Sequence, residues 1–385
     1  MTTKIKKISL AATLVFMTIY FTGCINLTKK ETAPERVINS DQGVFKSVDG
    51  GKTWEHKVNV EGGDFLDSIV ITGMKLDPKD SKIMYVSTES NGLYKTENGA
   101  DSWIKIIDES NVLGPDATVN DIAIEKNNNK IIYLAATNNG RGVVLKSEDG
   151  GKNWQEKYIT DENNKTVHTV EIDPASPNVV YIGTAQGGLI KSSNRGLNWE
   201  TVKWFDVGTE VMDILIDYNN NNGIVLKTSL GIIKSTDKGK TWEDLGIKIS
   251  EDVPEVVVAN INYITLHPYN PIIIYFTYLN LVVVSKDGGN NWEKLNTITP
   301  AQTAIGTAPQ VKKIGLIGDK IYYGAGNALY KSDDAGKTWS SYAIAIKGDV
   351  RYTESDYTNP DVTYVGSFYT PPPPPKRQRN ALFNF

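Results

Sequence analysis

A segment of eight residues that ends in tryptophan occurs seven times along this chain of 385 residues. The clearest copy, residues 47–54, reads SVDGGKTW, and the tryptophans of successive copies stand 43 to 51 residues apart. The other copies are residues 96–103, 147–154, 192–199, 235–242, 285–292 and 332–339. Such a period indicates one small unit built repeatedly, because a single unit of this size cannot bury its apolar face alone. The chain is therefore restricted to repeat architectures.

The residues within each copy are those of a tight turn. A Ser or Thr hydroxyl and an Asp or Asn side chain bond the turn amides, and a glycine supplies the φ > 0 conformation. The tryptophan then covers the turn as an apolar cap. In the second copy Asn98 and Ala100 replace Asp and Gly, which we expect to loosen that turn. We assign structural roles to Asp49, Asn98, Asp149, Asn194, Asp237, Asp287 and Asp334, and to Trp54, Trp103, Trp154, Trp199, Trp242, Trp292 and Trp339.

Each repeat also contains four short strand-like stretches. In the fourth repeat, residues 170–174 and 179–184 form an apolar pair, and a third stretch runs directly into the turn. A fourth begins at the tryptophan, as in residues 154–157. Four short antiparallel strands per unit are typical of a β-propeller blade.

The two ends of the array predict how the ring closes. The first unit, from Gly43 to about Val60, has only the third and fourth strands of a blade, and residues 350–369 have only the first and second. Together these ends complete one blade, which leaves no bare sheet edge. We predict an all-β fold: a seven-bladed propeller of four-stranded blades over residues 43–370, closed by pairing of N- and C-terminal strands.

The N-terminus has the order of a secretory signal. A basic segment is followed by an apolar one, residues 8–21, and then by Cys24, the only cysteine in the chain. Residues 21–24, FTGC, resemble the lipobox of bacterial lipoproteins, which implies cleavage before Cys24 and lipidation of its thiol. A plain signal peptide or an uncleaved anchor helix are the alternatives. We expect a signal peptide at residues 1–23, a polar tether at 24–42, and a disordered Pro-rich, basic tail at 371–385.

Charge weighs against nucleic acid as a partner. The formal net charge is −4, and removal of the signal peptide leaves 38 basic against 45 acidic residues, or about −7. Binding to phosphates requires a concentrated basic face.

The turn segments resemble the Asp box, S/T-x-D-x-G-x-T-W, of BNR-type propellers, and the resemblance covers nearly everything from residue 43 to 370. Sialidases of this kind need three arginines to grip a carboxylate, but only Arg141 and Arg351 lie outside the tether, boxes and tail. Residues 173–199 also resemble the blade pattern of xyloglucan-degrading glycoside hydrolases. Those enzymes place their catalytic carboxylates between two propellers, whereas one propeller is predicted here. Sortilin and photosystem II assembly-factor propellers instead use the ring as a docking platform.

Candidate ligand-binding residues come from the predicted channel mouth, where loops lead into the first strand or join the second to the third. Those at the start of the first strand are Asn120, His168, Asn262, Tyr263, Lys312 and Arg351. Those between the second and third strands are Arg141, Gln186 and Tyr278. Asp121 and Asp213 are the catalytic candidates, because they occupy matched positions two blades apart. No His/Cys cluster or calcium loop is present, so we expect neither metal nor cofactor.

These observations favour a monomeric lipoprotein at the cell surface or on a periplasm-facing membrane. Its propeller is expected to bind a protein, peptide or glycan at the channel mouth. The alternative is a glycoside hydrolase that acts on extracellular polysaccharide, closer to the xyloglucanases than to the sialidases.

Overall fold

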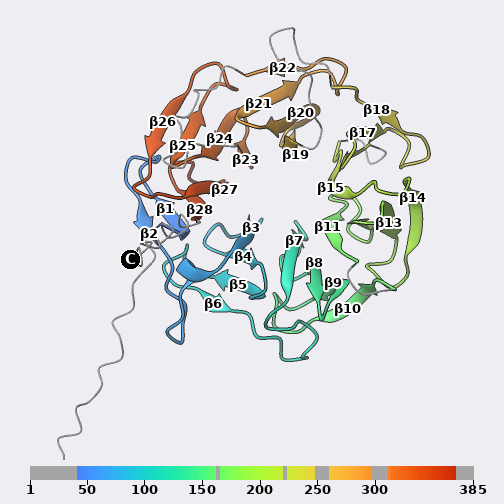
Figure 1. Ribbon diagram of the computed structural model, residues 1–385, viewed down its shortest axis with the longest axis horizontal. Coiled ribbons are helices and arrows are strands. Elements are labelled where there is room, and N and C mark those ends of the chain that lie inside the picture. Colours follow the sequence, from blue (N-terminus) through green and yellow to red (C-terminus); the bar gives the residue numbers. More distant parts are fainter. Residues whose placement is uncertain are drawn as a thin grey trace, which may run out of the picture. The chain divides into compact units, whose positions relative to one another are not determined.

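The computed structural model describes residues 41–161, 165–219, 223–247, 260–295, 311 and 313–369. These residues belong to one compact unit, Asn39–Phe385. They form seven four-stranded antiparallel sheets arranged around a central channel (Figure 1), which confirms the predicted all-β, seven-bladed propeller. The predicted signal peptide, the lipidation site Cys24, nearly all of the tether, Lys312 and the tail lie outside the described residues.

Six blades are continuous in sequence, and in each of them the strands follow one another from the channel outward. The first three are β3 (Ile71–Leu76), β4 (Met84–Thr88), β5 (Leu93–Thr96) and β6 (Ile104–Lys105); β7 (Thr118–Ile124), β8 (Ile132–Asn138), β9 (Arg141–Ser147) and β10 (Gln155–Ile159); and β11 (Val167–Ile172), β12 (Val180–Thr184), β13 (Gly188–Ser192) and β14 (Glu200–Trp204). The next three are β15 (Val211–Ile216), β16 (Ile224–Thr228), β17 (Ile232–Ser235) and β18 (Glu243–Asp244); β19 (Ile261–His267), β20 (Asn270–Tyr278), β21 (Leu281–Ser285) and β22 (Glu293–Lys294); and β23 (Ile314–Ile317), β24 (Lys320–Ala325), β25 (Ala328–Ser332) and β26 (Ser340–Ala343).

The seventh blade is built from both ends of the described chain. Its order from the channel outward is β27 (Asp349–Ser355), β28 (Thr363–Phe368), β1 (Gly43–Ser47) and β2 (Glu55–His56). β1 and β28 pair antiparallel along five residues, from Gly43 opposite Ser367 to Ser47 opposite Thr363. The Ser367 hydroxyl also donates to the carbonyl of Asp41 at 3.0 Å. The ring closes as the sequence predicted.

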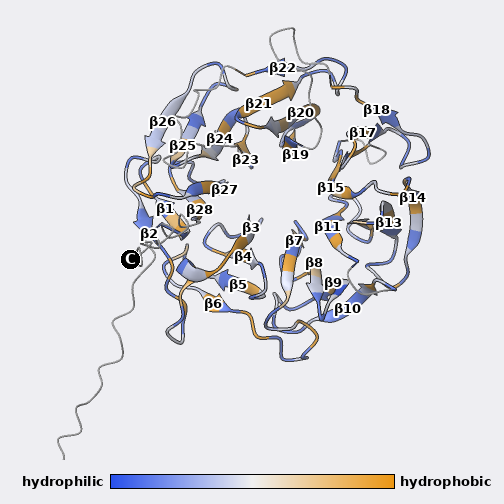
Figure 2. Cartoon of the chain, in the orientation of Figure 1, coloured by the Kyte–Doolittle hydropathy of each residue, from blue (hydrophilic) through white to orange (hydrophobic). Residues whose placement is uncertain are grey.

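The core is divided among the interfaces between neighbouring blades. Strand faces contribute buried side chains from both sides of each interface, so that Tyr85 and Leu93 of one blade share a cluster with Ile132 and Leu134 of the next. In Figure 2 a strand inside a blade such as β21 is hydrophobic, whereas outermost strands such as β10 and β18 are hydrophilic. Every blade therefore depends on two neighbours for burial, as expected for a ring of units with one apolar face each.

The Asp boxes form the turns between the third and fourth strands. In the first box, the Ser47 hydroxyl donates to Asp49 at 2.8 Å and accepts from the Gly51 amide at 2.8 Å. The Thr53 hydroxyl donates to Asp49 at 2.7 Å, and this bond contributes most to lowering the pKa of Asp49, to about 2. Among the box tryptophans, Trp103 and Trp154 are fully buried.

The expected loosening of the second box does not occur. The Asn98 amide oxygen accepts from the Thr96 hydroxyl at 2.9 Å and from the Ser102 amide at 3.0 Å, as the carboxylate does elsewhere. Ala100 adopts the left-handed conformation, with φ of 71°, in place of glycine. The hydrogen bonds tolerate these changes because an amide oxygen replaces a carboxylate oxygen as acceptor.

Small residues in the second strands allow neighbouring blades to approach. A Cβ atom at Gly324 of β24 would lie 2.0 Å from Cγ1 of Val350 on β27. We predict that Gly324→Ala lowers the free energy of unfolding by about 1–3 kcal/mol through overpacking. Gly231→Ala is the control, because its Cβ would meet nothing closer than 3.7 Å. Denaturant unfolding of both variants checks this, and equal stability of the two would contradict it.

Candidate functional site

A β-bulge occurs at the same place in six of the seven innermost strands. In each, the pairing with the second strand skips one residue near the start of the first, as between Ile71 and Gly73. The skipped residues are Thr72, Asn120, His168, Met212, Asn262 and Arg351. The equivalent Lys312 lies outside the described residues. Bulges redirect side chains next to functional sites, and here they lie at the end of the channel where the sequence predicted ligand contacts.

Three bulge side chains connect one blade to the next. Each donates to the backbone carbonyl just before the following blade's bulge position. The bonds are Thr72 to Val119 at 2.6 Å, Asn120 to Val167 at 2.9 Å and Asn262 to Val311 at 3.0 Å. His168 differs, because its Nε2 lies 3.0 Å from a carboxylate oxygen of Glu210. Asn120 and Asn262 thus have a structural role, whereas the His168–Glu210 pair is partly exposed at the mouth.

A cavity of about 690 Å³ occupies the channel behind these bulges, and residues from all seven blades line it. Of the residues predicted from the sequence, it brings together Asn120, Asp121, His168, Asp213, Asn262, Tyr263 and Arg351. Three others lie elsewhere. Arg141 begins β9 and donates to the carbonyl of Thr160, Gln186 is in the turn between β12 and β13, and Tyr278 is buried at the end of β20. These three residues do not line the cavity.

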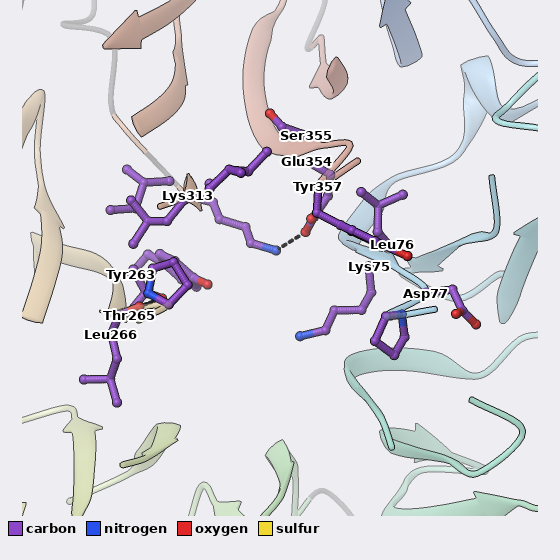
Figure 3. A pocket seen from close by; sticks show the side chains of 16 residues that line it. Lys75, Leu76, Asp77, Tyr263, Thr265, Leu266, Lys313, Glu354, Ser355 and Tyr357 are labelled. Carbon is purple, nitrogen blue, oxygen red and sulfur yellow. Dashed lines mark hydrogen bonds and ion pairs between the residues drawn. The ribbon is translucent and has the colours of Figure 1, made fainter. Parts of the chain in front are cut away.

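A second cavity of about 310 Å³ lies against the first and shares Lys75, Tyr263, Thr265 and Lys313 with it. Its other walls are largely apolar and include Leu76, Leu266 and Leu316. Figure 3 shows the ammonium groups of Lys75 and Lys313 pointing into this space from different blades. The two cavities are consecutive parts of one channel, with charged groups where they meet.

The two catalytic candidates differ in how the protein holds them. The Asp121 carboxylate accepts from the Ile122 amide at 2.8 Å, the Thr169 hydroxyl at 2.9 Å and the Val170 amide at 3.1 Å. It therefore joins β7 to β11. Asp213 accepts from the Ile214 amide at 3.0 Å.

Lys227 faces Asp213 from the next strand. In the pairing of β15 with β16 the two residues are opposite one another. Burial raises the pKa of Asp213 to about 7, and the charge of Asp121 adds to this effect. Burial also lowers the pKa of Lys227. Both effects disfavour charge on the pair, as expected for groups that protein largely surrounds.

Glu171 and Lys75 are a second carboxyl group and amine in the channel, after Asp213 and Lys227. Burial raises the pKa of Glu171 to about 8, although the charge of Lys75 acts in the opposite direction. Burial disfavours the charge on Lys75, but the carboxylates of Glu171 and Glu354 outweigh it and raise the pKa of Lys75. Lys75 is exposed within the cavity, and the surrounding protein accounts for the effect of burial on its pKa.

The basic groups on the other side of the channel are held more firmly. The Lys313 ammonium lies 2.7 Å from a carboxylate oxygen of Glu354 (Figure 3) and 5.7 Å from the centre of the Tyr263 ring. The Arg351 guanidinium carbon lies 3.9 Å from the centre of the Phe368 ring. Stacking of this kind fixes a guanidinium while leaving its N–H groups free to bind a ligand.

Sequence reasoning missed Lys75, Glu171, Lys227 and Glu354. Lys75, Glu171 and Glu354 each stand three residues after a bulge, a position that becomes meaningful only once the bulge is known. Lys227 carried a detectable signal, because the matching position of the other second strands holds only small residues. Those are Ser87, Ala135, Gly183, Thr277, Gly324 and Gly366. A lysine that departs from such a repeat indicates a local function.

Other features are absent from the described part of the chain. Within it, no three His, Cys, Asp or Glu side chains are grouped so that they could hold a metal ion. None of its segments forms a helix with the length and hydropathy that crossing a membrane requires.

This chain is similar to two kinds of propeller protein. The family profile described as photosynthesis system II assembly factor YCF48 matches residues 191–378, just under half of the chain. A curated xyloglucanase from Paenibacillus sp. is 26% identical over 388 aligned residues, which cover 84% of this chain and 35% of that enzyme. This chain thus spans about a third of the length of that relative.

Solved structures show the same two kinds. The GH74 xyloglucanase from Xanthomonas campestris superposes with a TM-score of 0.61 at 16% identity, over 84% of this chain and 52% of the other. A structure described as YCF48 bound to D1 peptide superposes with a TM-score of 0.56 at 14% identity, over 78% of this chain and 94% of the other. At these identities the likeness is one of fold, and function has to be argued from the site.

Proposed function

We propose that this protein is a surface-anchored binding protein whose propeller channel takes a protein, peptide or glycan ligand. The observation that carries the proposal is the cavity of about 690 Å³ to which every blade contributes. Its size falls within the roughly 300–1,000 Å³ of small-ligand pockets. Its lining combines acids, amides, bases and tyrosines that differ from blade to blade while the scaffold repeats. The structural likeness to YCF48, solved with a bound peptide, supports this use of the ring.

Glycoside hydrolysis is the second candidate, and one observation favours it. Asp121 and Asp213 line the same cavity, and the pKa of Asp213 is raised to about 7, as a general acid requires. The xyloglucanase relative is consistent with this possibility. One fact weighs against it: three protein donors already bind the Asp121 carboxylate.

The experiment that separates the two is a screen of the purified propeller on xyloglucan, β-glucans and sialosides. We predict binding without turnover. If turnover is observed, Asp213→Asn is the test, because an amide cannot transfer the proton and a catalytic acid is worth about 10²–10⁴-fold in rate. Asp116→Asn, an exposed loop carboxylate, is the matched control. Turnover that Asp213→Asn abolishes and Asp116→Asn preserves would overturn the binding proposal.

The variant at Asp121 needs a separate stability check. The two amides of Ile122 and Val170 donate to different oxygens of Asp121. Asparagine has only one side-chain oxygen, so its NH₂ group would face one of these two N–H donors. Leaving such a donor unsatisfied costs about 1–3 kcal/mol. Loss of turnover in the double variant Asp121→Asn with Asp213→Asn therefore counts against the binding proposal only if thermal unfolding shows that the double variant remains folded.

A further inference from the structure

The charges of the channel are segregated around the ring. Acidic groups come from three consecutive blades, whose inner strands are β7, β11 and β15, and we call this side the acidic wall. Basic groups come from the blades of β23, β27 and β3, the basic wall. Figure 1 shows these two sets of strands on opposite sides of the channel. The acidic wall consists of Asp121, Glu171 and Asp213, with Glu210 beside His168 at the mouth, and the basic wall consists of Lys75, Lys313 and Arg351.

One opposed charge lies within each wall. Lys227 faces Asp213 within the acidic wall, and Glu354 pairs with Lys313 in the basic wall. These two partners reduce the charge of each wall without reversing its sign. The blade of β19, which separates the walls on one side, contributes the uncharged Asn262 and Tyr263. The channel is therefore dipolar across its width.

Glu171 and Lys75 are the two charged side chains of the cavity that are most available to bind a ligand. Both side chains line the same cavity, Lys75 from β3 and Glu171 from β11. Within the residues that the structure describes, however, neither side chain makes a hydrogen bond or an ion pair. The space between them is part of the cavity. Arg351 on the same wall as Lys75 likewise has a ring contact but no ion pair to a described residue.

A ligand that suits this arrangement must carry both charges. Its ammonium would bind Glu171 and Asp213, and a cation at that position would favour the ionised forms that burial otherwise disfavours. Its carboxylate would bind Lys75 and Arg351. The hydroxyls of a neutral glycan can form hydrogen bonds with these groups but carry no charge to pair with either wall. A polyanion would meet the acidic wall, and a polycation would meet the basic wall. We propose that the channel binds a short peptide through its free N-terminal ammonium and C-terminal carboxylate, an inference that rests on the proposed binding function.

The test uses an equimolar pool of tripeptides with free termini. Thermal unfolding is measured with this pool and with the same pool N-acetylated and C-amidated, and equilibrium dialysis with mass spectrometry identifies the retained peptides. We expect the free pool to raise the midpoint of unfolding and the blocked pool to leave it unchanged, because bound ligand stabilises the folded state. Pools blocked at one end only should each lose most of the effect.

Variants assign the two termini to the two walls. Lys75→Met and Glu171→Gln should each weaken binding of the retained peptides by about tenfold to a hundredfold, as expected for loss of one charge-assisted contact. Lys126→Met and Glu156→Gln, both on the exposed surface, are the matched controls and should bind as the parent does. The exchange of Lys75→Glu together with Glu171→Lys should recover part of the lost affinity, with the peptide reversed.

The outcomes distinguish this inference from the function on which it rests. Equal effects of free and blocked peptides, or no retention of free tripeptides, would overturn the inference. If xyloglucan oligosaccharides or a folded protein nevertheless bind and Arg351→Met weakens them, the channel is still a binding site and only the ligand class is wrong. If nothing tested binds, both proposals fail.

Discussion

Deletion of residues 350–369 is expected to abolish the cooperative unfolding of the propeller. This segment supplies β27 and β28, the two inner strands of the composite blade. Without them β1 loses its five-residue pairing, and the neighbouring blades lose the buried Val350 and Val365. The cost is far larger than that of a point change, because exposed strand edges and blade faces remain on both sides of the gap. We therefore expect aggregation or a broad transition in circular dichroism.

The control is deletion of residues 371–385 alone, which retains every strand of the composite blade. That variant should unfold in a single transition at the parental midpoint. A milder variant, Val365→Pro, keeps the chain length but removes a ladder hydrogen bond from a central strand and should lower the midpoint of unfolding. Parental melting of the 350–369 deletion would mean that the composite blade is not needed to close the ring.

The propeller could be predicted from the sequence because its determinants are local and repeated. A turn held by Ser47, Asp49 and Gly51 needs no distant contact. Its seven occurrences gave the number of blades, and the incomplete first and last repeats gave the closure. Even the altered second box, with Asn98, retained its bonds because acceptor geometry matters more there than charge.

The interior of the channel could be predicted only in part. Aligning the repeats located the residues that line the mouth, including Asp121, His168 and Asp213. It could not show the bulges, because a bulge is a property of the pairing between two strands. It also could not show that Lys75 of β3 and Glu171 of β11 line the same cavity, because that depends on the curvature of the whole ring.

The roles of the lining residues were harder still to predict. Asn120 and Asn262 look like ligand-binding amides in the sequence, but in the structure they donate to the backbone of the next blade. Asp121 resembles a free carboxylate until its three donors are seen. The raised pKa of Glu171 is a consequence of burial, which composition does not reveal. Polar residues at a predicted mouth therefore need the structure before ligand contacts can be told from contacts between blades.

The second large effect concerns anchoring, for which Cys24 is the proposed lipid attachment site. We expect Cys24→Ser to shift the protein from the detergent phase to the aqueous phase, or to arrest its processing, when the protein is expressed in a bacterium and detergent partitioning is measured. The reason is that two or more acyl chains attach a protein stably to a membrane, and a protein without them loses this attachment. Metabolic labelling with a palmitate analogue should mark the parent protein and not the variant.

Two comparisons make this result specific to the thiol. Cys24→Ala should behave as Cys24→Ser does, since neither side chain accepts the lipid. Gly23→Ala, which alters the adjacent residue and keeps the thiol, should still be labelled, because lipoprotein cleavage sites tolerate small residues before the cysteine. If Cys24→Ser is unlabelled but remains fully in the detergent phase, the apolar residues 8–21 hold the protein in the membrane as an uncleaved helix. The lipobox interpretation would then be wrong, whereas the channel and its ligand would be unaffected, because no residue that lines the cavity precedes Thr72.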